Sequence, residues 1–217
     1  MNILDYQAAV FDFDGTIIDS MNMWSEIDVE YLSRYGHEPG PFLHDEIEGM
    51  SPGEMAVYFR KNYGIPRTDE EMIQDWVEMS VTKYLYELRL KPHVCEFLSF
   101  LRDRGLKIGV ATSTAMDIIV PCFEKRGIAR FFDTIVTTGE CGKGKPAPDV
   151  YLRAAERLGV NPSECLAFED LPAGILAAKA AGFYTIAVDD SFSRNKEAEK
   201  RKMADLFIYD FSELTVS

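Results

Sequence analysis

The sequence predicts an α/β protein, with a Rossmann-like parallel sheet covered by helices on both faces and a small α-helical domain inserted into it. From Lys91 onward, short apolar runs alternate with segments of helical periodicity, which is the pattern of a parallel sheet with crossover helices. Between about Ser20 and Leu90 the periodicity is helical, without a strand-like run. We therefore expect a core formed by residues 1–19 and 91–217 and a helical insertion over residues 20–90.

The first predicted strand is the apolar run that leads into Asp12 and Asp14. Successive side chains of a strand point to opposite faces, so these two carboxylates should share one side and Phe11 and Phe13 the other. Gly15 allows the sharp turn that follows. Neighbouring carboxylates repel each other unless they share a proton or bind a divalent cation. The run therefore predicts a reactive site, with two turn-capping Asp residues as the alternative interpretation.

The inserted segment is expected to form about four helices. Clusters of proline and glycine divide it at residues 39–41, 51–53 and 64–66. Ser51 and Glu54 fit a capping box, with Pro52 at the first helical position. Because the insertion directly follows the Asp14 turn, it should lie over that turn. The two linkers, 15–20 and 88–92, are then expected to act as hinges for its closure.

The rest of the core is predicted as five strands, each joined to the next by a helix. The expected strands are 106–111, 134–138, 165–168, 185–188 and 206–208. The expected helices are 94–102, 117–125, 149–158, 173–180 and 195–202. Ligands of such sheets bind beyond the carboxyl ends of the strands, so the residues that follow each strand are the candidates for a site.

Composition excludes several classes of function. The formal net charge is −13, which disfavours nucleic acids and anionic membranes as partners. The basic cluster over residues 196–202 contains Glu197 and Glu199, and we interpret it as a solvated helix face. The sequence shows neither a leader-like start nor an apolar run of membrane-spanning length, so a cytoplasmic monomer is expected. The four cysteines and three histidines are scattered, which favours neither a zinc site nor a Cys–His or Ser–His nucleophile pair.

Three of the predicted strands are followed by groups that could bind a phosphate or a metal ion. The second is followed by Thr112, Ser113 and Thr114, whose hydroxyl and N–H groups precede a helix. The third is followed by a loop with Lys145, and the fourth by Glu169 and Asp170. Each group alone is typical of an ordinary cap or turn, but their occurrence at successive strand ends indicates one shared site.

Together these motifs resemble those of the haloacid dehalogenase-like hydrolase superfamily, in the phosphatase and phosphomutase branch close to beta-phosphoglucomutase. The four motifs are Asp12-Phe-Asp14-Gly-Thr, Thr112 in Ala-Thr-Ser-Thr, Lys145 in Lys-Pro-Ala-Pro-Asp, and Phe-Glu169-Asp170-Leu-Pro. The resemblance covers the whole chain, and the helical insertion matches the family's cap domain in position and length. It implies a phosphatase that hydrolyses a small phosphomonoester, such as a sugar phosphate, through an aspartyl-phosphate intermediate.

The resemblance also implies roles for individual residues. Asp12 would be the nucleophile, and Asp14 the general acid and then the base. Thr112, Ser113 and Lys145 would hold the phosphoryl oxygens. Mg²⁺ would be held by Asp12, the backbone carbonyl of Asp14, Asp170 and, as an alternate or more distant partner, Glu169. Substrate selection would fall to cap residues, with Trp24, Glu48 and Met50 as candidates.

Other readings of these motifs remain open. Residues 139–145 fit the first seven positions of a P-loop, but Pro146 supplies neither the hydroxyl nor the N–H of the eighth. Lys143 is a rival to Lys145 for the phosphate contact. A phospho-accepting signalling receiver also combines Asp, Thr and Lys, although Asp14 and the insertion argue against it.

Particular residues argue against two branches of the family and against the mutase activity. Asp14 argues against a dehalogenase, since a halide leaving group needs no acid. The interval between Gly36 and Arg60 holds no Lys or Arg, whereas the phosphonate-cleaving branch needs a cap lysine and the sugar phosphomutases use an arginine near the position of Pro52. Acidic residues occur there instead, at positions 38, 45, 46, 48 and 54. We therefore expect a phosphatase for a neutral or cationic leaving group, with a sugar phosphomutase as the alternative. The simpler interpretation of the loop is that its acidic side chains point outward into solvent.

Overall fold

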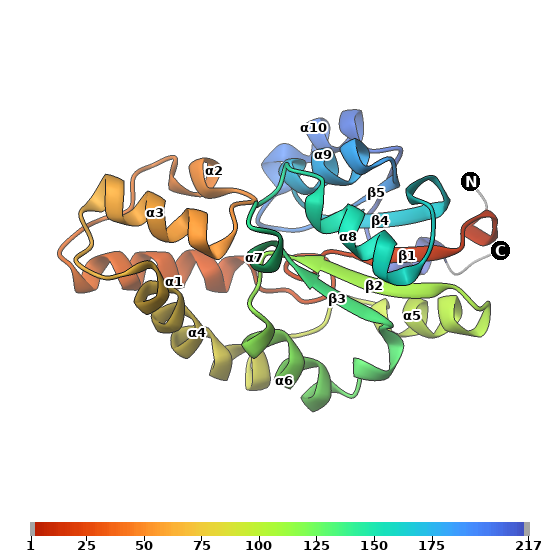
Figure 1. Ribbon diagram of the computed structural model, residues 1–217, viewed down its shortest axis with the longest axis horizontal. Helices are drawn as coiled ribbons and strands as arrows, with labels where there is room; N and C mark the ends of the chain where they lie inside the picture. Colours follow the sequence, from red (N-terminus) through yellow and green to blue (C-terminus); the bar gives the residue numbers. More distant parts are fainter. Residues whose placement is uncertain (1–2, 215–217) are drawn as a thin grey trace.

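The structure is a computed structural model that describes residues 3–214; the outermost residues of the predicted core boundaries, 1–2 and 215–217, lie outside the described part. Its centre is a six-stranded parallel sheet in the order β3-β2-β1-β4-β5-β6 (Figure 1). The strands are β1 (Ala8–Phe11), β2 (Lys107–Thr112), β3 (Thr134–Thr137), β4 (Cys165–Glu169), β5 (Tyr184–Val188) and β6 (Leu206–Ile208). The predicted α/β class and the five later strands are confirmed, with ends that differ by a residue or so.

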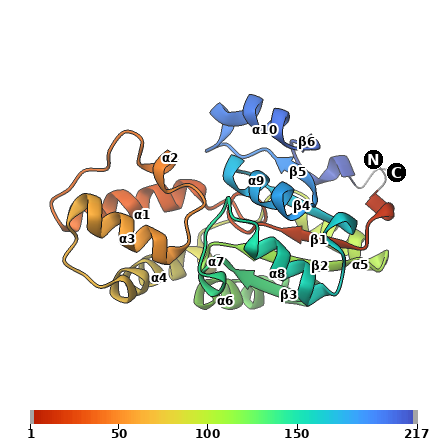
Figure 2. The same cartoon turned by 45° about the horizontal axis from the view of Figure 1, so that its top comes forward.

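Helices cover both faces of the sheet (Figures 1 and 2). One face carries α5 (Val94–Asp103) and α6 (Met116–Arg126), and the other carries α8 (Asp149–Leu158) and α9 (Pro172–Ala181), with α10 (Glu197–Met203) beside α9. Short helical turns join these elements, namely η1 (Ile3–Asp5), η2 (Ala129–Phe131), α7 (Thr138–Cys141), η3 (Pro162–Glu164), η4 (Arg194–Lys196) and η5 (Phe211–Leu214). The sequence analysis missed α7, because four residues are too few for a periodic signal.

The central strand is buried on both sides, which explains its continuous apolar sequence. Phe11 points to the α5 side, where its ring stacks on that of Phe168 with a centroid distance of 4.4 Å. Val10 points to the α8 side and joins the cluster that contains Tyr151. Because β1 lies between β2 and β4, the chain that leaves its carboxyl end emerges in the middle of the sheet. The loops after β2 and β4 are then its immediate neighbours.

The inserted segment forms a helical lobe, defined here as residues 21–86, at the carboxyl ends of the strands (Figures 1 and 2). It contains α1 (Met21–Arg34), α2 (Leu43–Ile47), α3 (Pro52–Tyr63) and α4 (Asp69–Tyr86). The predicted capping box is present, since the Ser51 hydroxyl accepts from the Glu54 N–H and the Glu54 carboxylate accepts from the Ser51 N–H. A small aromatic core of Tyr31, Phe59 and Trp76 joins α1, α3 and α4.

The basic cluster over residues 196–202 was predicted to be a solvated helix face, and this holds for Arg201 and Lys202 but is wrong for Lys196 and Lys200. Lys200 is fully buried, and its ammonium donates to the Ser193 hydroxyl at 2.9 Å and to the Val188 carbonyl at 3.2 Å. Burial lowers its pKa from the usual value. Lys196 is also half-buried, because it pairs with two carboxylates of the helical lobe. Alternation of charge along a sequence cannot reveal such partners, which come from distant segments.

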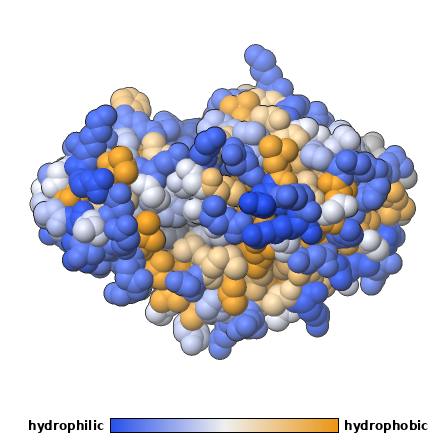
Figure 3. Space-filling view, in the orientation of Figure 1, coloured by the Kyte–Doolittle hydropathy of each residue, from blue (hydrophilic) through white to orange (hydrophobic). Residues whose placement is uncertain are grey.

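The outer surface carries mostly hydrophilic residues, with apolar ones in small separate patches on the face shown in Figure 3. Within residues 3–214, no helix combines the length and the apolar character needed to cross a membrane.

Candidate active site

The site is organised around Asp12, the first residue beyond β1. Its N–H donates to the Phe168 carbonyl at 2.9 Å, which extends the pairing of β1 with β4 by one step. The residue is only 7% exposed. Burial raises the pKa of Asp12 to about 8; the neighbouring Lys145 opposes this shift, and the carboxylates of Glu169 and Asp14 add to it. A carboxylate in this position depends on nearby cations to remain ionised.

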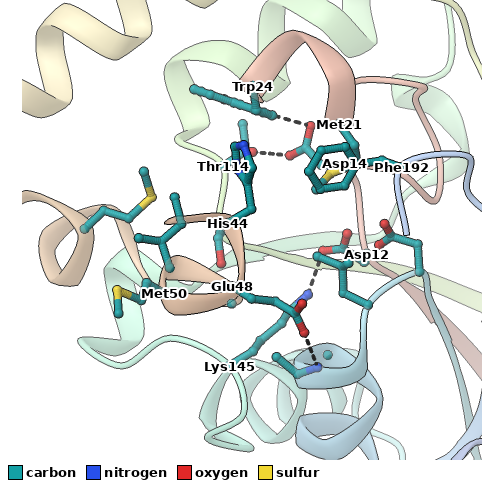
Figure 4. Close-up of a pocket in the computed structure, with 18 of the residues that line it drawn as sticks. Asp12, Asp14, Met21, Trp24, His44, Glu48, Met50, Thr114, Lys145 and Phe192 are labelled. Carbon is teal, nitrogen blue, oxygen red and sulfur yellow. Dashed lines mark hydrogen bonds and ion pairs between the residues drawn. The ribbon is translucent and has the colours of Figure 1, made fainter. Parts of the chain in front are cut away.

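Lys145 is the cation that the protein itself provides. Its ammonium donates to Asp12 Oδ1 at 2.6 Å, to Glu169 Oε1 at 2.6 Å and to the Ala111 carbonyl at 3.1 Å (Figure 4). The Tyr151 hydroxyl also donates to Glu169 Oε1. Burial alone would lower the pKa of Lys145, but the two carboxylates raise it above the usual value, so the side chain is charged.

The geometry of the Lys145 loop argues against the two alternative interpretations, which are a phosphate contact by Lys143 and a P-loop. Lys143 lies on the surface, where its nearest carboxylate is that of Asp149 at 3.7 Å. A P-loop would require a helix that begins at its lysine, whereas α8 begins only at Asp149.

A compact acidic cluster flanks Lys145. Asp12, Glu169 and Asp170 each offer a carboxylate oxygen within 4.8 Å of the others. Asp170 is 1% exposed, yet neither of its carboxylate oxygens has a hydrogen-bond partner. Burial, followed by Asp12, Asp190 and Glu169, raises its pKa well above the usual value. Two unpartnered buried oxygens in an acidic cluster fit a divalent cation, which prefers oxygen ligands.

Gly15 makes room for this cluster. Its backbone has φ +73°, and a Cβ atom there would lie 2.1 Å from Asp170 Oδ2. Only glycine combines this left-handed conformation with so close an approach. The turn after β1 therefore brings the backbone of residues 14 and 15 against Asp170.

Asp14 has a different set of partners from Asp12. Its Oδ1 accepts from the Ser20 hydroxyl at 2.5 Å, from Trp24 Nε1 at 3.4 Å and from the Tyr84 hydroxyl, and its Oδ2 accepts from the Thr114 hydroxyl. Figure 4 shows the contacts with Trp24 and Thr114. Strand alternation does not set its position, because β1 ends at Phe11 and Asp14 forms only an isolated bridge with Ile18. Asp14 thus ties the turn to the helical lobe and to the loop after β2.

Thr112 ends β2, Ser113 and Thr114 begin the loop after it, and all three line the same cavity as Asp12. The Thr112 hydroxyl accepts from the Thr114 N–H at 3.0 Å, which folds the loop back toward the sheet. The sequence analysis did not single out the Thr114 contact with Asp14. The Thr-Ser-Thr triplet could have suggested it, but nothing local indicates Tyr84 or Tyr151, which come from distant helices.

The acidic loop of the helical lobe faces the site at Asp45 and Glu48, which share the ammonium of Lys196. Glu48 Oε1 accepts from the Ala173 N–H at 3.0 Å, and Glu48 Oε2 lies 2.6 Å from the ammonium of Lys196. Asp45 Oδ1 is also 2.6 Å from that ammonium. The expectation of outward-pointing acids is therefore wrong for Glu48. The two carboxylates share one ammonium, so this part of the loop keeps a net negative charge.

The lobe and the sheet meet closely around a cavity of about 380 Å³. The Glu54 carboxylate accepts from the Gly144 N–H at 2.8 Å, and a Cβ on Gly49 would lie 2.6 Å from the Lys145 carbonyl. Asp12, Asp14, Lys145 and Asp170 line the cavity from the sheet side. Trp24, Glu48 and Met50 line it from the lobe (Figure 4). All of the predicted site residues therefore meet in one place.

A family model described as haloacid dehalogenase-like hydrolase matches residues 9–188, which is most of the chain. The chain belongs to the haloacid dehalogenase-like hydrolase family. It is 33% identical over 183 residues to "Putative phosphatase YhcW" of Bacillus subtilis (strain 168), covering 84% of this chain and 83% of that protein. It is 29% identical to the "Phosphorylated carbohydrates phosphatase" of Thermotoga maritima, with 83% of each chain covered.

Solved structures show the same fold. The beta-phosphoglucomutase of Clostridium difficile superposes with a TM-score of 0.81 at 24% sequence identity, covering 97% of this chain and 94% of that one. The resemblance drawn from the four motifs is thus confirmed at the level of family and fold.

Proposed function

We propose that the protein is a Mg²⁺-dependent phosphatase that hydrolyses a small phosphomonoester through a phosphorylated Asp12. The observation that carries the proposal is the buried group formed by Asp12, Lys145 and Asp170, in which Asp12 is paired with a lysine and Asp170 has two unpartnered oxygens. The names of the relatives, which include a phosphatase of phosphorylated carbohydrates, support it.

Asp12, Asp170 and the backbone carbonyl of Asp14 would hold the Mg²⁺ ion. Glu169 is the weakest candidate ligand, because its Oε1 is already engaged by Lys145 and Tyr151. When bound, the ion would offset the repulsion between a phosphate dianion and the acidic cluster.

The side chains of the site supply the rest of the chemistry. Asp12 would attack the phosphorus atom to form an acyl phosphate, and Lys145 and the loop of Thr112 and Ser113 would hold the phosphoryl oxygens. Asp14 would protonate the leaving oxygen and then take a proton from the attacking water. Asp14 accepts four hydrogen bonds in the present structure, and it would first exchange some of them for contacts with the substrate. Because two of the donors, Trp24 and Tyr84, belong to the helical lobe, movement of the lobe would change the hydrogen bonds that Asp14 accepts.

We also propose that residues 20–90 act as a cap on a core formed by residues 1–19 and 91–217. The cap would exclude water when closed and would open at the linkers 15–20 and 88–92. Its present contacts with the core, through Lys196 and through the Gly144 N–H, would be those of the closed state.

A phosphatase is favoured over a sugar phosphomutase by the charges of the cavity. Among the described lining residues there is no arginine, and both lysines, Lys145 and Lys196, are already paired with two carboxylates each. A mutase must hold two phosphates at once, which calls for a second free cation. The basis of this preference is that Lys196 is shared by two carboxylates, which leaves no net positive charge for a second phosphate.

The experiment is phosphate release from a panel of phosphomonoesters and sugar 1-phosphates, with Mg²⁺ and with chelator, for wild type and Asp12→Asn. Free phosphate that requires both Mg²⁺ and Asp12 supports the proposal. Isomerised sugar phosphate without free phosphate would identify a mutase instead. A stable phosphorylated protein without turnover would identify a signalling receiver.

A further inference from the structure

A group of buried polar side chains adjoins Asp170, and the proposed chemistry does not use it. The group consists of Asp190 and Ser193, from the loop after β5, and Lys200 of α10. Each of the three residues is at most 1% exposed. A fully buried lysine is rare, and its burial costs free energy unless polar partners compensate it. The partners of Lys200 therefore indicate what this group does.

The contacts of Lys200 fix the direction of the Ser193 hydroxyl. The Lys200 ammonium donates to Ser193 Oγ at 2.9 Å and to the Val188 carbonyl at 3.2 Å. An ammonium can only donate, so the serine oxygen is the acceptor and its single proton is left for another partner. That partner is the backbone carbonyl of Asp170, which lies 3.0 Å from Ser193 Oγ. Lys200 thus directs the Ser193 proton to Asp170.

Asp170 depends on its backbone for its position. Neither of its carboxylate oxygens has a hydrogen-bond partner within residues 3–214, so the side chain is held by packing and by the peptide that carries it. The packing is close, since a Cβ atom on Gly15 would lie 2.1 Å from Asp170 Oδ2. By binding the Asp170 carbonyl, Ser193 fixes the peptide from which this carboxylate projects.

The loop after β5 is also anchored independently of the Ser193 hydroxyl. The Asp190 carboxylate accepts from the Phe192 N–H at 2.9 Å and lies 2.8 Å from the Lys91 ammonium. That ammonium also donates to the Asp189 carbonyl at 3.1 Å. Loss of the Ser193 hydroxyl should therefore leave the loop folded, and its effect on Asp170 can be measured separately.

We infer that Ser193 is a positioning residue for Asp170, and that its hydroxyl, directed by Lys200, holds the Asp170 carboxylate in place for a divalent cation. Residues that orient a metal ligand typically contribute roughly 10–100-fold to the affinity for the metal. The contact of Ser193 is to the backbone of the ligand, so we expect an effect of about tenfold, at the lower end of that range. The inference rests on the metal site of the proposed function and adds a residue from outside the four motifs.

The test measures the Kd of Mn²⁺, as a spectroscopic substitute for Mg²⁺, on substrate-free protein by electron paramagnetic resonance. Ser193→Ala removes the hydroxyl without removing a charge, so it should raise the Kd about tenfold through the position of Asp170 alone. Ser191→Ala, at an exposed position of the same loop, is the matched control and should leave the Kd unchanged. Asp170→Asn should lose the binding, which identifies the site that is measured.

An unchanged Kd in folded Ser193→Ala would overturn the inference and leave the phosphatase function standing. A lower urea midpoint with an unchanged Kd would do the same, because it would give Ser193 a purely structural role. If Ser193→Ala does not fold, Ser193→Cys decides, since its thiol fills the same place and is only a weak donor; a raised Kd there supports the inference and an unchanged one contradicts it. Wild type that binds no Mn²⁺, or Asp170→Asn that binds it as tightly as wild type, would refute the proposed metal site as well.

Discussion

The two walls of the cavity are polar in different ways. On the sheet side, Asp12, Lys145 and Glu169 are joined by hydrogen bonds within one buried network, and only Asp170 has oxygens without partners. On the lobe side, apolar side chains surround a few isolated polar atoms, of which Asp28 Oδ1 and Trp76 Nε1 have no partner. In the proposed function, the first wall would bind a cation and a phosphate, and the second would contact the organic part of the substrate. Catalysis and substrate contact would then fall to different segments of the chain.

The largest effect should come from the sheet wall. Asp12→Asn removes the proposed nucleophile and should lower kcat by roughly 10⁴-fold or more for every substrate, because no other group can take the phosphoryl group. Phosphate release measures it. If the Asp12→Asn variant kept one tenth of wild-type turnover, Asp12 would not be the nucleophile and the chemistry would not be confined to the sheet wall.

Removal of Lys145 should affect stability and activity together. Lys145→Met leaves the Asp12 and Glu169 carboxylates buried without their cation, which should cost about 3–5 kcal/mol of unfolding free energy. Urea denaturation measures this, preferably without Mg²⁺. Lys143→Met is the matched control, and should change neither stability nor turnover because that side chain is exposed. Equal stability of the two variants would contradict the network.

The lobe wall should show its own pH dependence. Burial raises the pKa of Asp28 to about 7, whereas the unfolded chain has the usual lower value. The folded protein therefore retains a proton that the unfolded chain loses, so this group's contribution to stability is full below about pH 4 and is lost as pH rises toward 7. The raised pKa corresponds to a loss of up to about 4 kcal/mol of unfolding free energy over this pH range.

Asp28→Asn isolates this contribution, since the amide cannot titrate. Urea midpoints from pH 4 to pH 7.5 should show that wild type loses stability relative to the variant as pH rises. A constant difference between the two proteins over that range would mean that Asp28 is ionised when buried.

The contacts between the two walls should have the smallest effect. Lys196→Met breaks the partly exposed pairs with Asp45 and Glu48, which should cost about 1 kcal/mol and raise KM a few-fold by favouring the open lobe. Lys202→Met, on the exposed part of the same segment, is the control. A large fall in kcat with an unchanged KM would instead give Lys196 a direct part in the chemistry.

The sheet wall was largely predictable from the sequence, and the lobe wall was not. Asp12, Thr112, Lys145 and Asp170 each follow a strand, and parallel strands bring their carboxyl ends to one edge, so order along the chain was enough to group them. Asp28, His44 and Trp76 meet only because three helices pack at particular angles, which helical periodicity does not specify.

Partners from distant segments account for the remaining differences. Tyr84 binds Asp14, and Tyr151 binds Glu169, although neither tyrosine stands in a motif. Lys196 and Lys200 were predicted to be exposed to solvent, because their hydrogen-bond and ion-pair partners lie in other elements. Buried polar contacts of this kind depend on tertiary packing, and a local pattern of charges carries no information about them.

The most direct test of the central claim is mass analysis of rapidly quenched enzyme during turnover of the best substrate with Mg²⁺. The account predicts one phosphoryl group on the peptide that contains Asp12, absent without Mg²⁺ and absent in Asp12→Asn. Phosphate release at full rate with no phosphorylated protein at any quench time, or with the label on another residue, would contradict it.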